Sequence, residues 1–378
     1  MEKIEATFRV VTPMFISGAE QEKAELRVPS IKGALRFWWR ALAWSRYGDL
    51  KKIREEEDRL FGSTNTGQSM FLAKVKEDDV SSLSTGKQVS GGIAYLGYGI
   101  AEYKRERRRV ETIRDAIAPG SQFLLQISFK KGAEVHRDEL LNTLWCLTNL
   151  GGMGSRSRRG FGSMVVTEVE GGKYPSIPRS ANELKEQIEQ KLREFRIHEL
   201  HKLPEYTALS GHTTVMIWPL HTRSWEQALE KVGSRLNAYR SSRQERNFLD
   251  DRNLIRDYAY GRAHPSYAPR RTIFGLPHNY FFVDTKTNIP ISGPSRERDR
   301  RASPLFMHLH QLENKELVAV LSLIPASFLP KGSKAKVGPA VQNKRRIADE
   351  VLVRPPNDFS PIKEFLSSLS QETLEVQV

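Results

Sequence analysis

Cysteine is almost absent from this sequence of 378 residues, in which Cys146 is the only one. A disulfide within the chain is therefore impossible, and zinc sites built from several cysteines are excluded. Long apolar runs are also missing, so no segment is expected to span a membrane, and the first residues lack the pattern of a signal peptide. We expect a cytoplasmic protein that does not bind membranes.

Known catalytic and nucleotide-binding motifs are missing too. The sequence contains no G-x-S-x-G, no H-E-x-x-H and no Cys/His nucleophile pattern. Nine histidines occur, but the pairs His198/His201 and His308/His310 have no evident third ligand nearby, which argues against a metal site. We predict no catalytic residue, no metal and no cofactor. A metal-independent ribonuclease needs only a general acid and a general base, so that alternative stays open.

Positive charge, by contrast, is abundant. Lysine and arginine total 59 against 45 aspartates and glutamates, which gives a formal net charge of +14. This excess favours a polyanionic partner, and nucleic acid fits it better than a membrane surface. Eight arginines fall between residues 240 and 271, Arg243 among them. With 39% hydrophobic residues, the chain can bury sizeable cores in two or three domains.

Residues 151–163 read GGMGSRSRRGFGS and combine glycine and arginine more densely than any other segment. The segment is expected to connect a helix to the strand at residues 164–169, so it is neither a P-loop nor a dinucleotide fingerprint. Glycine allows close approach of the backbone, and arginine offers a fork of donors to phosphate oxygens. We predict a loop that binds a nucleic-acid backbone. The alternative is a long surface loop with solvated arginines.

A basic helix is predicted at residues 31–47. Lys32, Arg36 and Arg40 recur at intervals of four and share one face, with Trp39 beside them and no acidic neighbours evident. Gly33 costs helix stability, which suggests that something approaches the backbone there. The alternatives are a solvated basic face and a tryptophan that is packed rather than free to stack on a base.

The order of predicted elements indicates a repeated unit. Residues 4–11 alternate apolar and polar side chains as a half-buried strand does, and residues 4–169 follow the order strand, helix, strand, strand, helix, strand. The same order begins again at Thr213, where residues 305–312 and 316–324 read as a hairpin around Asn314. This βαββαβ order is ferredoxin-like and underlies many single-strand RNA binders, although a fold alone does not assign a function.

We therefore predict an α+β protein with two ferredoxin-like, RRM-like domains that carry inserted hairpin and helical arms. Residues 1–170 form the first domain with the glycine-rich loop, 171–212 a linker and amphipathic helix, and 213–378 the second domain. Residues 91–102 read as a hairpin arm, which runs into the basic stretch at 104–109. Such a charged run is more typical of a solvated tip than of a direct contact.

Several of these segments resemble a known family. VPSIKGALR at 28–36, FGS at 61–63 and the glycine loop resemble the RAMP superfamily of CRISPR proteins. More particularly, VTPMF at 11–15, KGALRFWWR at 32–40, FGLP at 274–277 and FLP at 328–330 resemble the family of first subunits of the Cmr (type III-B) effector complex. The resemblance spans most of the chain.

The resemblance implies two ferredoxin-like domains in a crRNA-guided complex that destroys foreign RNA. In such complexes this subunit holds the 3′ part of the crRNA, sits against other RAMP subunits and helps capture target RNA, while cleavage belongs to another subunit. RAMP relatives that process crRNA use a histidine early in the chain. The first histidine here is His136, which counts against that activity.

The sequence thus predicts a non-catalytic RNA-binding and assembly subunit whose partners are single-stranded RNA (crRNA, target RNA or both) and other RAMP subunits. A metal-independent endoribonuclease of the RAMP type and a pure protein scaffold are the alternatives. The predicted RNA-contacting residues are Lys32, Gly33, Arg36, Trp39 and Arg40 of the helix, and Gly151, Gly152, Gly154, Ser155, Arg156, Arg158, Arg159, Gly160 and Gly162 of the loop.

Overall fold

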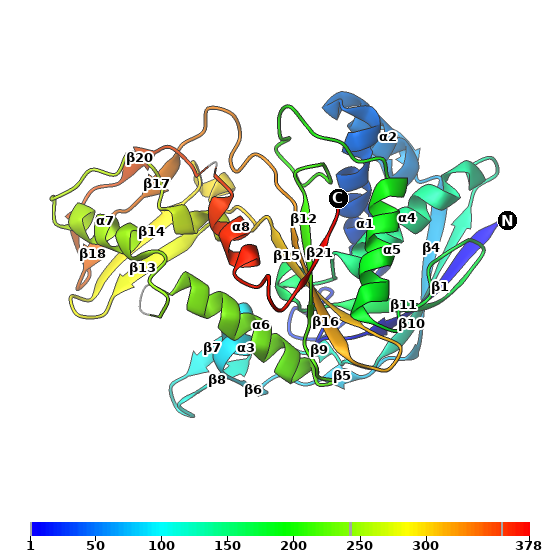
Figure 1. The fold of residues 1–378 in the computed structure, drawn as a ribbon, viewed down its shortest axis with the longest axis horizontal. Coiled ribbons are helices and arrows are strands. Elements are labelled where there is room, and N and C mark those ends of the chain that lie inside the picture. Colours follow the sequence, from blue (N-terminus) through cyan, green and yellow to red (C-terminus); the bar gives the residue numbers. More distant parts are fainter. Residues whose placement is uncertain (1, 242–243, 357) are drawn as a thin grey trace.

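The computed structural model describes residues 2–241, 244–356 and 358–378, so Arg243 lies outside the described residues. Three sheets dominate the molecule, which is elongated in Figure 1. The first sheet lies near the N-terminus, the second in the middle, and the third in a lobe at the opposite end. None of the helices in the described part of the chain is long and apolar enough to cross a membrane.

The first sheet contains four antiparallel strands in the order β11-β1-β10-β4. Their bounds are β1 Lys3–Val10, β4 Phe71–Asp79, β10 Gln122–Phe129 and β11 Met164–Glu170. Every second residue of β1 and β10 is buried, which confirms the alternation predicted for the first strand. When the four strands are numbered by their order in the chain, they lie across the sheet as fourth, first, third, second.

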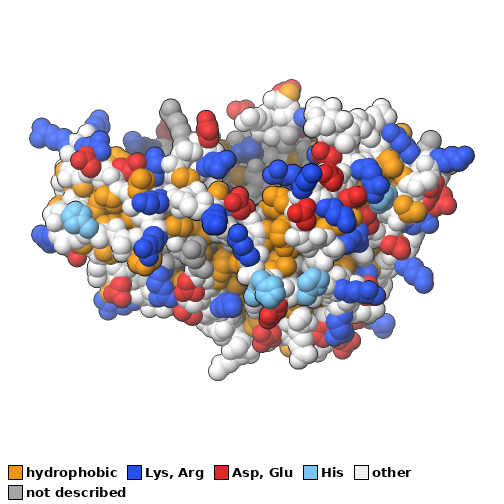
Figure 2. Space-filling model, turned by 90° about the horizontal axis from the view of Figure 1, so that it is seen from above, with side chains coloured by type: hydrophobic (Ala, Val, Ile, Leu, Met, Phe, Trp, Pro, Cys, Tyr) orange, Lys and Arg blue, Asp and Glu red, His pale blue; other side chains and the backbone are white. Residues whose placement is uncertain are grey.

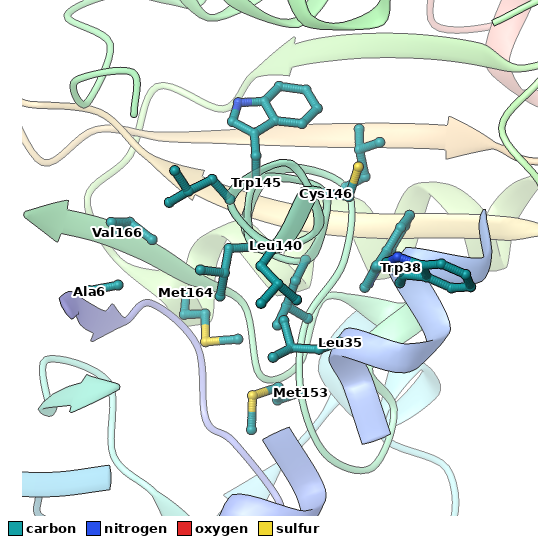
Figure 3. Close-up of a cluster of buried hydrophobic side chains, with 14 of the residues drawn as sticks. Ala6, Leu35, Trp38, Leu140, Trp145, Cys146, Met153, Met164 and Val166 are labelled. Atoms are coloured by element: carbon teal, nitrogen blue, oxygen red, sulfur yellow. The ribbon is translucent and has the colours of Figure 1, made fainter. Parts of the chain in front are cut away.

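Helices α1 (Val28–Tyr47) and α4 (Arg137–Asn149) cover one face of this sheet. Figure 3 shows the core between them, to which Leu35 and Trp38 of α1, Leu140 and Trp145 of α4, and Met164 of β11 contribute. On α1, Ile31, Leu35, Trp38 and Leu42 recur at helix spacing, which predicts an inner face, and all of them except the half-buried Leu42 are buried. α1 ends at Gly48, whose φ of 60° is a left-handed conformation that favours glycine.

The second sheet repeats the same strand order. Its strands are β12 Thr214–Pro219, β15 Leu305–Gln311, β16 Leu317–Leu323 and β21 Leu374–Val376, arranged β15-β16-β12-β21 with antiparallel neighbours. The predicted hairpin around Asn314 is β15–β16. When its four strands are numbered by their order in the chain, they lie across the sheet from the β21 edge as fourth, first, third, second, as in the first sheet.

Both faces of the second sheet are covered, and every residue of β16 is buried. One face joins the core of the first unit, with Ile217, Phe306 and Val320 packed in the same cluster as α1, α4 and α5 (Ala181–Glu194). The other face packs against α6 (Trp225–Arg240) and α8 (Ser360–Ser367). A continuous core therefore crosses the predicted boundary at residues 171–212.

Of the third sheet, the sequence predicts only a strand-like arm at residues 274–283, because most of its strands are short and lie in stretches rich in proline, glycine and charge. Two segments on either side of the β15–β16 hairpin form it, and α7 (Leu249–Ala259) packs beside it. The strands are β13 His278–Phe282, β14 Thr287–Ser292, β17 Ala335–Val337, β18 Ala340–Gln342, β19 Arg345–Ala348 and β20 Val351–Val353.

The hairpin predicted at residues 91–102 is wrong in position, because that segment begins with the helix α3 (Gly91–Leu96). The hairpin of this arm is β7 (Ala101–Lys104) with β8 (Arg109–Thr112), and β6 (Gln88–Val89) completes the small sheet. Two glycines bring α3 against α6, since a Cβ on Gly92 would lie 2.3 Å from the Glu230 carbonyl oxygen and one on Gly233 would lie 2.2 Å from the Gly92 oxygen. The carboxylate of Glu230 accepts the Gly92 N–H at 2.9 Å, which holds the start of α3.

Short elements complete the fold. They are α2 Leu50–Phe61, β2 Gly62–Ser63, β3 Gly67–Gln68, β5 Ser82–Leu83, β9 Ala116–Ile117, and the 3-10 turns η1 Glu134–His136, η2 Ser157–Arg159, η3 Arg270–Phe274 and η4 Arg296–Arg298.

Candidate nucleic-acid interface

The glycine loop is an ordered element held by the protein's own backbone. Within the loop, the Met153 N–H donates to the Gly162 carbonyl at 2.9 Å. The Ser155 N–H donates to the Phe15 carbonyl at 2.8 Å, and the Gly162 N–H donates to the Pro13 carbonyl at 2.9 Å. The loop is therefore fixed against the segment that follows β1, which carries the VTPMF motif.

Close approach between backbones explains two of the glycines. Gly154 has a φ of 86°, and a Cβ there would lie 2.5 Å from the Phe15 carbonyl oxygen. Gly162 has a φ of 65°, and its Cβ would lie 1.8 Å from the Met153 oxygen. The prediction of close backbone approach is confirmed for these positions, but the chain they approach is the protein itself.

The three arginines of the loop point in different directions. Arg158 donates to the Ser303 carbonyl at 2.7 Å and lies over the Phe306 ring at 4.3 Å from its centroid. Arg159 donates to the Phe274 carbonyl at 3.2 Å. Burial lowers the pKa of each guanidinium to about 10, so both remain charged at neutral pH. These two arginines brace the loop against the C-terminal half, which corrects the expectation that they are solvated or free for phosphate.

Arg156 differs from its neighbours because it is exposed. Its backbone has a φ of 62°, and its guanidinium lies 6.0 Å from the centroid of the exposed Tyr98 ring. The 3-10 turn η2 directs residues 157–159 inward, so Arg156 is the loop arginine that stays at the surface. The sequence could not separate the three, because the Ser303 carbonyl that accepts from Arg158 is 145 residues away.

A groove of about 540 Å³ lies between the loop and the first half of α1. Its floor is aromatic, and one rim is the start of α1, where no side chain caps the helix and the first turn holds no acidic residue. Pro29 has no N–H, and the N–H groups of Ser30 and Ile31 donate to the Arg27 carbonyl at 3.1 and 3.2 Å, so this helix end attracts anions through the helix dipole. The lining residues are Phe15, Ile16, Ser17, Ser30, Ala34, Phe37, Trp38, Gly151, Gly152, Met153, Gly154, Ser155, Ser157, Arg158 and Phe306.

The predicted basic face of α1 lies outside this groove, and its side chains are engaged within the fold. Lys32 donates to Ser69 Oγ at 2.9 Å, Arg36 bonds the Gly62 carbonyl, and Arg36 and Arg40 lie 3.8 and 3.4 Å from the Glu57 carboxylate. Burial raises the pKa of Glu57, and the two arginines oppose that shift. The expectation of a basic face without acidic neighbours was therefore wrong, because α2 brings Glu57 to it.

Trp39 and Gly33 have opposite surroundings. The Trp39 side chain is 2% exposed and donates to Glu139 Oε1 at 2.7 Å, so it cannot stack on a base, and the packed alternative holds. Gly33 is exposed, and a Cβ there would meet nothing within 4 Å. Nothing in the described fold requires glycine at this position.

Several groove residues were missed by the sequence analysis. Phe37 lies in the KGALRFWWR motif but was overshadowed by its charged neighbours, and Phe306 looked like an ordinary strand residue. His308 was considered only as a metal ligand, yet its Nδ1 donates to the Gly151 carbonyl at 2.7 Å and holds the start of the loop. Among the described residues, no group of three or more His, Cys, Asp or Glu side chains could hold a metal ion.

Charge alone does not mark the interface. On the face shown in Figure 2, lysine and arginine side chains are spread widely and are interleaved with acidic ones. The groove is distinguished by its shape and by the helix end and glycine loop that form its rims.

The sequence of this chain is similar to those of known proteins. The sequence model of the RAMP superfamily matches residues 7–165. CRISPR system Cmr subunit Cmr1-2 of Pyrococcus furiosus is 29% identical over 172 residues, which are 41% of this chain and 90% of that protein. Cmr subunit Cmr1-1 of the same organism is 26% identical over 324 residues, 82% of this chain and 84% of that one.

Solved structures show the same fold. The crystal structure of Cmr1 from Pyrococcus furiosus in its apo form matches with a TM-score of 0.57 and 23% identity, over 100% of this chain and 99% of that chain. A chain of the type III-B Cmr-beta, solved by cryo-EM with cognate target RNA and AMPPnP, matches with a TM-score of 0.54 and 14% identity, over 98% and 99%. Residues 7–165 therefore resemble the RAMP superfamily, and the similarity of the chain to Cmr1 subunits extends over most of its length.

Proposed function

We propose that this protein is an RNA-binding and assembly subunit of a crRNA-guided, RNA-targeting effector complex of the type III-B (Cmr) class. It works in the cytoplasm beside other RAMP subunits and has no nuclease activity of its own. The observation that carries the proposal is the groove between α1 and the glycine loop, which has room for a nucleotide segment and anion-attracting rims. Similarity to Cmr1-1 over 82% of the chain supports the assignment to a Cmr complex.

Single-stranded RNA lies along this groove in the proposal. Its phosphates face the N-terminus of α1 and the Ser30 and Ser155 side chains of the groove lining. Outside that lining, the strand continues past the exposed Arg156, which lies beside Tyr98. Sugars or bases rest against Phe37, the half-buried aromatic ring of the lining. Ser303 and Phe306 hold the Arg158 side chain in place at the inner end of the groove. Its guanidinium therefore adds positive charge to the groove from a fixed position.

The proposal narrows the residue set expected from the sequence. Gly151, Gly152, Gly154 and Ser155 line the groove, whereas Gly160 and Gly162 are buried beneath it. Lys32 bonds Ser69, and Arg36 and Arg40 serve the contact between α1 and α2. Trp39 and Arg159 serve packing.

We also infer that both halves of the chain are ferredoxin-like units. The shared strand order of the two four-stranded sheets supports this, since each runs fourth, first, third, second with antiparallel neighbours. In the first unit, the groove lies at the loop that connects α4 to β11.

Fluorescence anisotropy with labelled single-stranded RNA across a salt series tests the proposal. Wild type is expected to bind, with affinity that falls as salt rises, and Arg156→Ala is expected to bind more weakly with a salt slope reduced by about 1. Arg262→Ala, which removes an exposed arginine of the C-terminal lobe, is the matched control and should behave as wild type. If wild type does not bind RNA even at low salt, the protein is a pure protein scaffold instead.

A second assay tests the absence of catalysis. Labelled RNA incubated with the protein, with and without EDTA, should remain intact. Cleavage that persists in EDTA and copurifies with the protein would identify it as a metal-independent endoribonuclease instead.

A further inference from the structure

A cluster of buried cationic and polar side chains lies where the glycine loop meets the third sheet. Arg159 comes from the loop, Arg240 from the last residue of α6, Arg271 from η3, and His278 and Tyr280 from β13. Arg159 bonds the Phe274 carbonyl at 3.2 Å, and the Arg240 guanidinium lies 4.9 Å from the centroid of the same residue's ring. The rings of His278 and Tyr280 are 4.9 Å apart.

The positive charges of this cluster act on one another. After burial, Arg240 is the main cause that lowers the pKa of Arg159, while burial and then Arg271 and Arg240 lower the pKa of His278 well below its usual range. At neutral pH, the imidazole is therefore neutral, and three guanidinium groups share a poorly solvated space. The side chains thus form one electrostatic unit.

Each of the five residues has a buried polar atom without a hydrogen-bond partner among the described residues. The atoms are Arg159 Nη1, Arg240 Nε, Arg271 Nε, His278 Nε2 and the Tyr280 hydroxyl oxygen. Tyr280 is only 3% exposed and Arg240 only 8%. Buried polar groups are almost always paired, so five unpaired atoms in one place indicate a missing partner.

The nearby carboxylate does not supply that partner. Asp251 accepts the backbone N–H of Arg271 at 2.7 Å, and burial raises the pKa of its carboxyl group. Another nitrogen of Arg240 is already used by the Tyr95 hydroxyl at 2.6 Å. Three cations, of which Arg240 is buried and Arg159 and Arg271 are half-buried, therefore share one carboxylate, and burying a cation without a full counter-charge is costly.

We propose that a small oxyanion of the phosphate type binds inside this cluster and links the glycine loop to the third sheet. Its several oxygens accept from the arginine nitrogens and the tyrosine hydroxyl, and its charge compensates the guanidinium groups. An RNA backbone does not reach these atoms, because each is shielded from solvent. The ligand is therefore a free ion, and the site is separate from the proposed RNA groove.

The test uses the full-length protein purified without phosphate. Its thermal unfolding midpoint is measured against inorganic phosphate, with sodium chloride added to keep the ionic strength constant and sulfate as a second oxyanion. Above the dissociation constant, each tenfold rise in phosphate should raise the midpoint by roughly 2 °C. Phosphate released on denaturation is assayed in parallel, because an ion trapped during folding would appear there at about one per chain.

Matched variants locate the ion. Arg240→Gln and Tyr280→Phe should each lose most of the phosphate dependence or of the retained phosphate, and Tyr280→Phe keeps the ring if the arginine variant does not fold. Arg256→Gln removes an arginine of the same lobe that pairs with Asp284 at 3.0 Å, and it should behave as wild type. Arg156→Ala should also behave as wild type, which separates the ion site from the RNA groove.

Two outcomes would overturn the proposal. One is a wild type that retains no phosphate and unfolds at the same temperature in phosphate, sulfate and chloride. The other is a phosphate effect that survives in both Arg240→Gln and Tyr280→Phe, because the ion would then bind elsewhere.

Discussion

Replacing Ser30 by aspartate places a negative charge at the rim of the groove. Ser30 is the third residue of α1, it lines the groove, and the first turn of the helix contains no acidic residue. A carboxylate in the first turn interacts favourably with the helix dipole, so Ser30→Asp should be as stable as wild type or more stable by about 0.3–1 kcal/mol. The same carboxylate repels a phosphate that uses this helix end.

The size of that repulsion follows from the distance. Two charges about 4 Å apart interact by about 1 kcal/mol in bulk water and about 4 kcal/mol at an effective dielectric constant of 20. The groove is partly enclosed, so the repulsion should be at least that found in bulk water. Since about 1.4 kcal/mol of binding free energy corresponds to a tenfold change in affinity, RNA affinity should fall at least fivefold. The variant thus separates stability from binding, since the added charge favours the folded helix and lowers the affinity for RNA.

The assay is RNA anisotropy at low and high salt, together with chemical denaturation. Ser30→Asn is the matched control, because it has nearly the same shape as aspartate without the charge, and it should bind RNA almost as wild type does. The difference in RNA affinity between Ser30→Asp and Ser30→Asn should become smaller as salt screens the repulsion. Equal RNA affinity for both variants at low salt would refute the placement of a phosphate at this helix end.

Further predictions concern stability. Gly33→Ala should raise the free energy of unfolding by about 0.5–1 kcal/mol, since no atom lies within 4 Å of the new Cβ, and a loss of stability in denaturation would contradict this. Gly162→Ala should destabilise by more than about 2 kcal/mol, because its Cβ would lie 1.8 Å from the Met153 oxygen; near-neutral denaturation would show that the loop is not rigid. Burial lowers the pKa of His308 to about 4, below its unfolded value near 6.5. The contribution of the neutral imidazole to the free energy of unfolding is therefore fully present above pH 6.5 and is lost as the pH falls towards 4. Denaturation across this range should show a loss of about 3 kcal/mol that His308→Gln lacks, and an equal acid sensitivity of both proteins would contradict the assignment.

Local pattern was enough to predict much of the fold. Alternation at residues 4–11 identified β1, apolar spacing placed Leu35 and Trp38 in the core, and turn residues around Asn314 marked the β15–β16 hairpin. Most of the third sheet escaped prediction because strands of three or four residues, such as β17 and β18, are too short to show a period.

The candidate site was predicted only in part, because its details depend on contacts far apart in sequence. The loop was identified from its glycines, but Ser303 and Phe274 decide where Arg158 and Arg159 point. The basic face of α1 was identified correctly as a pattern, yet Glu57 on the next helix pairs with two of its three cations. Spacing within a segment carries no information about which partner the rest of the fold supplies.

The central claim is that RNA lies in the groove between α1 and the glycine loop. Ultraviolet crosslinking of single-stranded RNA to the protein, followed by mass spectrometric mapping of the crosslinked peptides, tests it most directly. The account predicts crosslinks in residues 15–17, 30–38 and 151–158, which line the groove. Crosslinks confined to the arm at 88–112 or to the third sheet would contradict it.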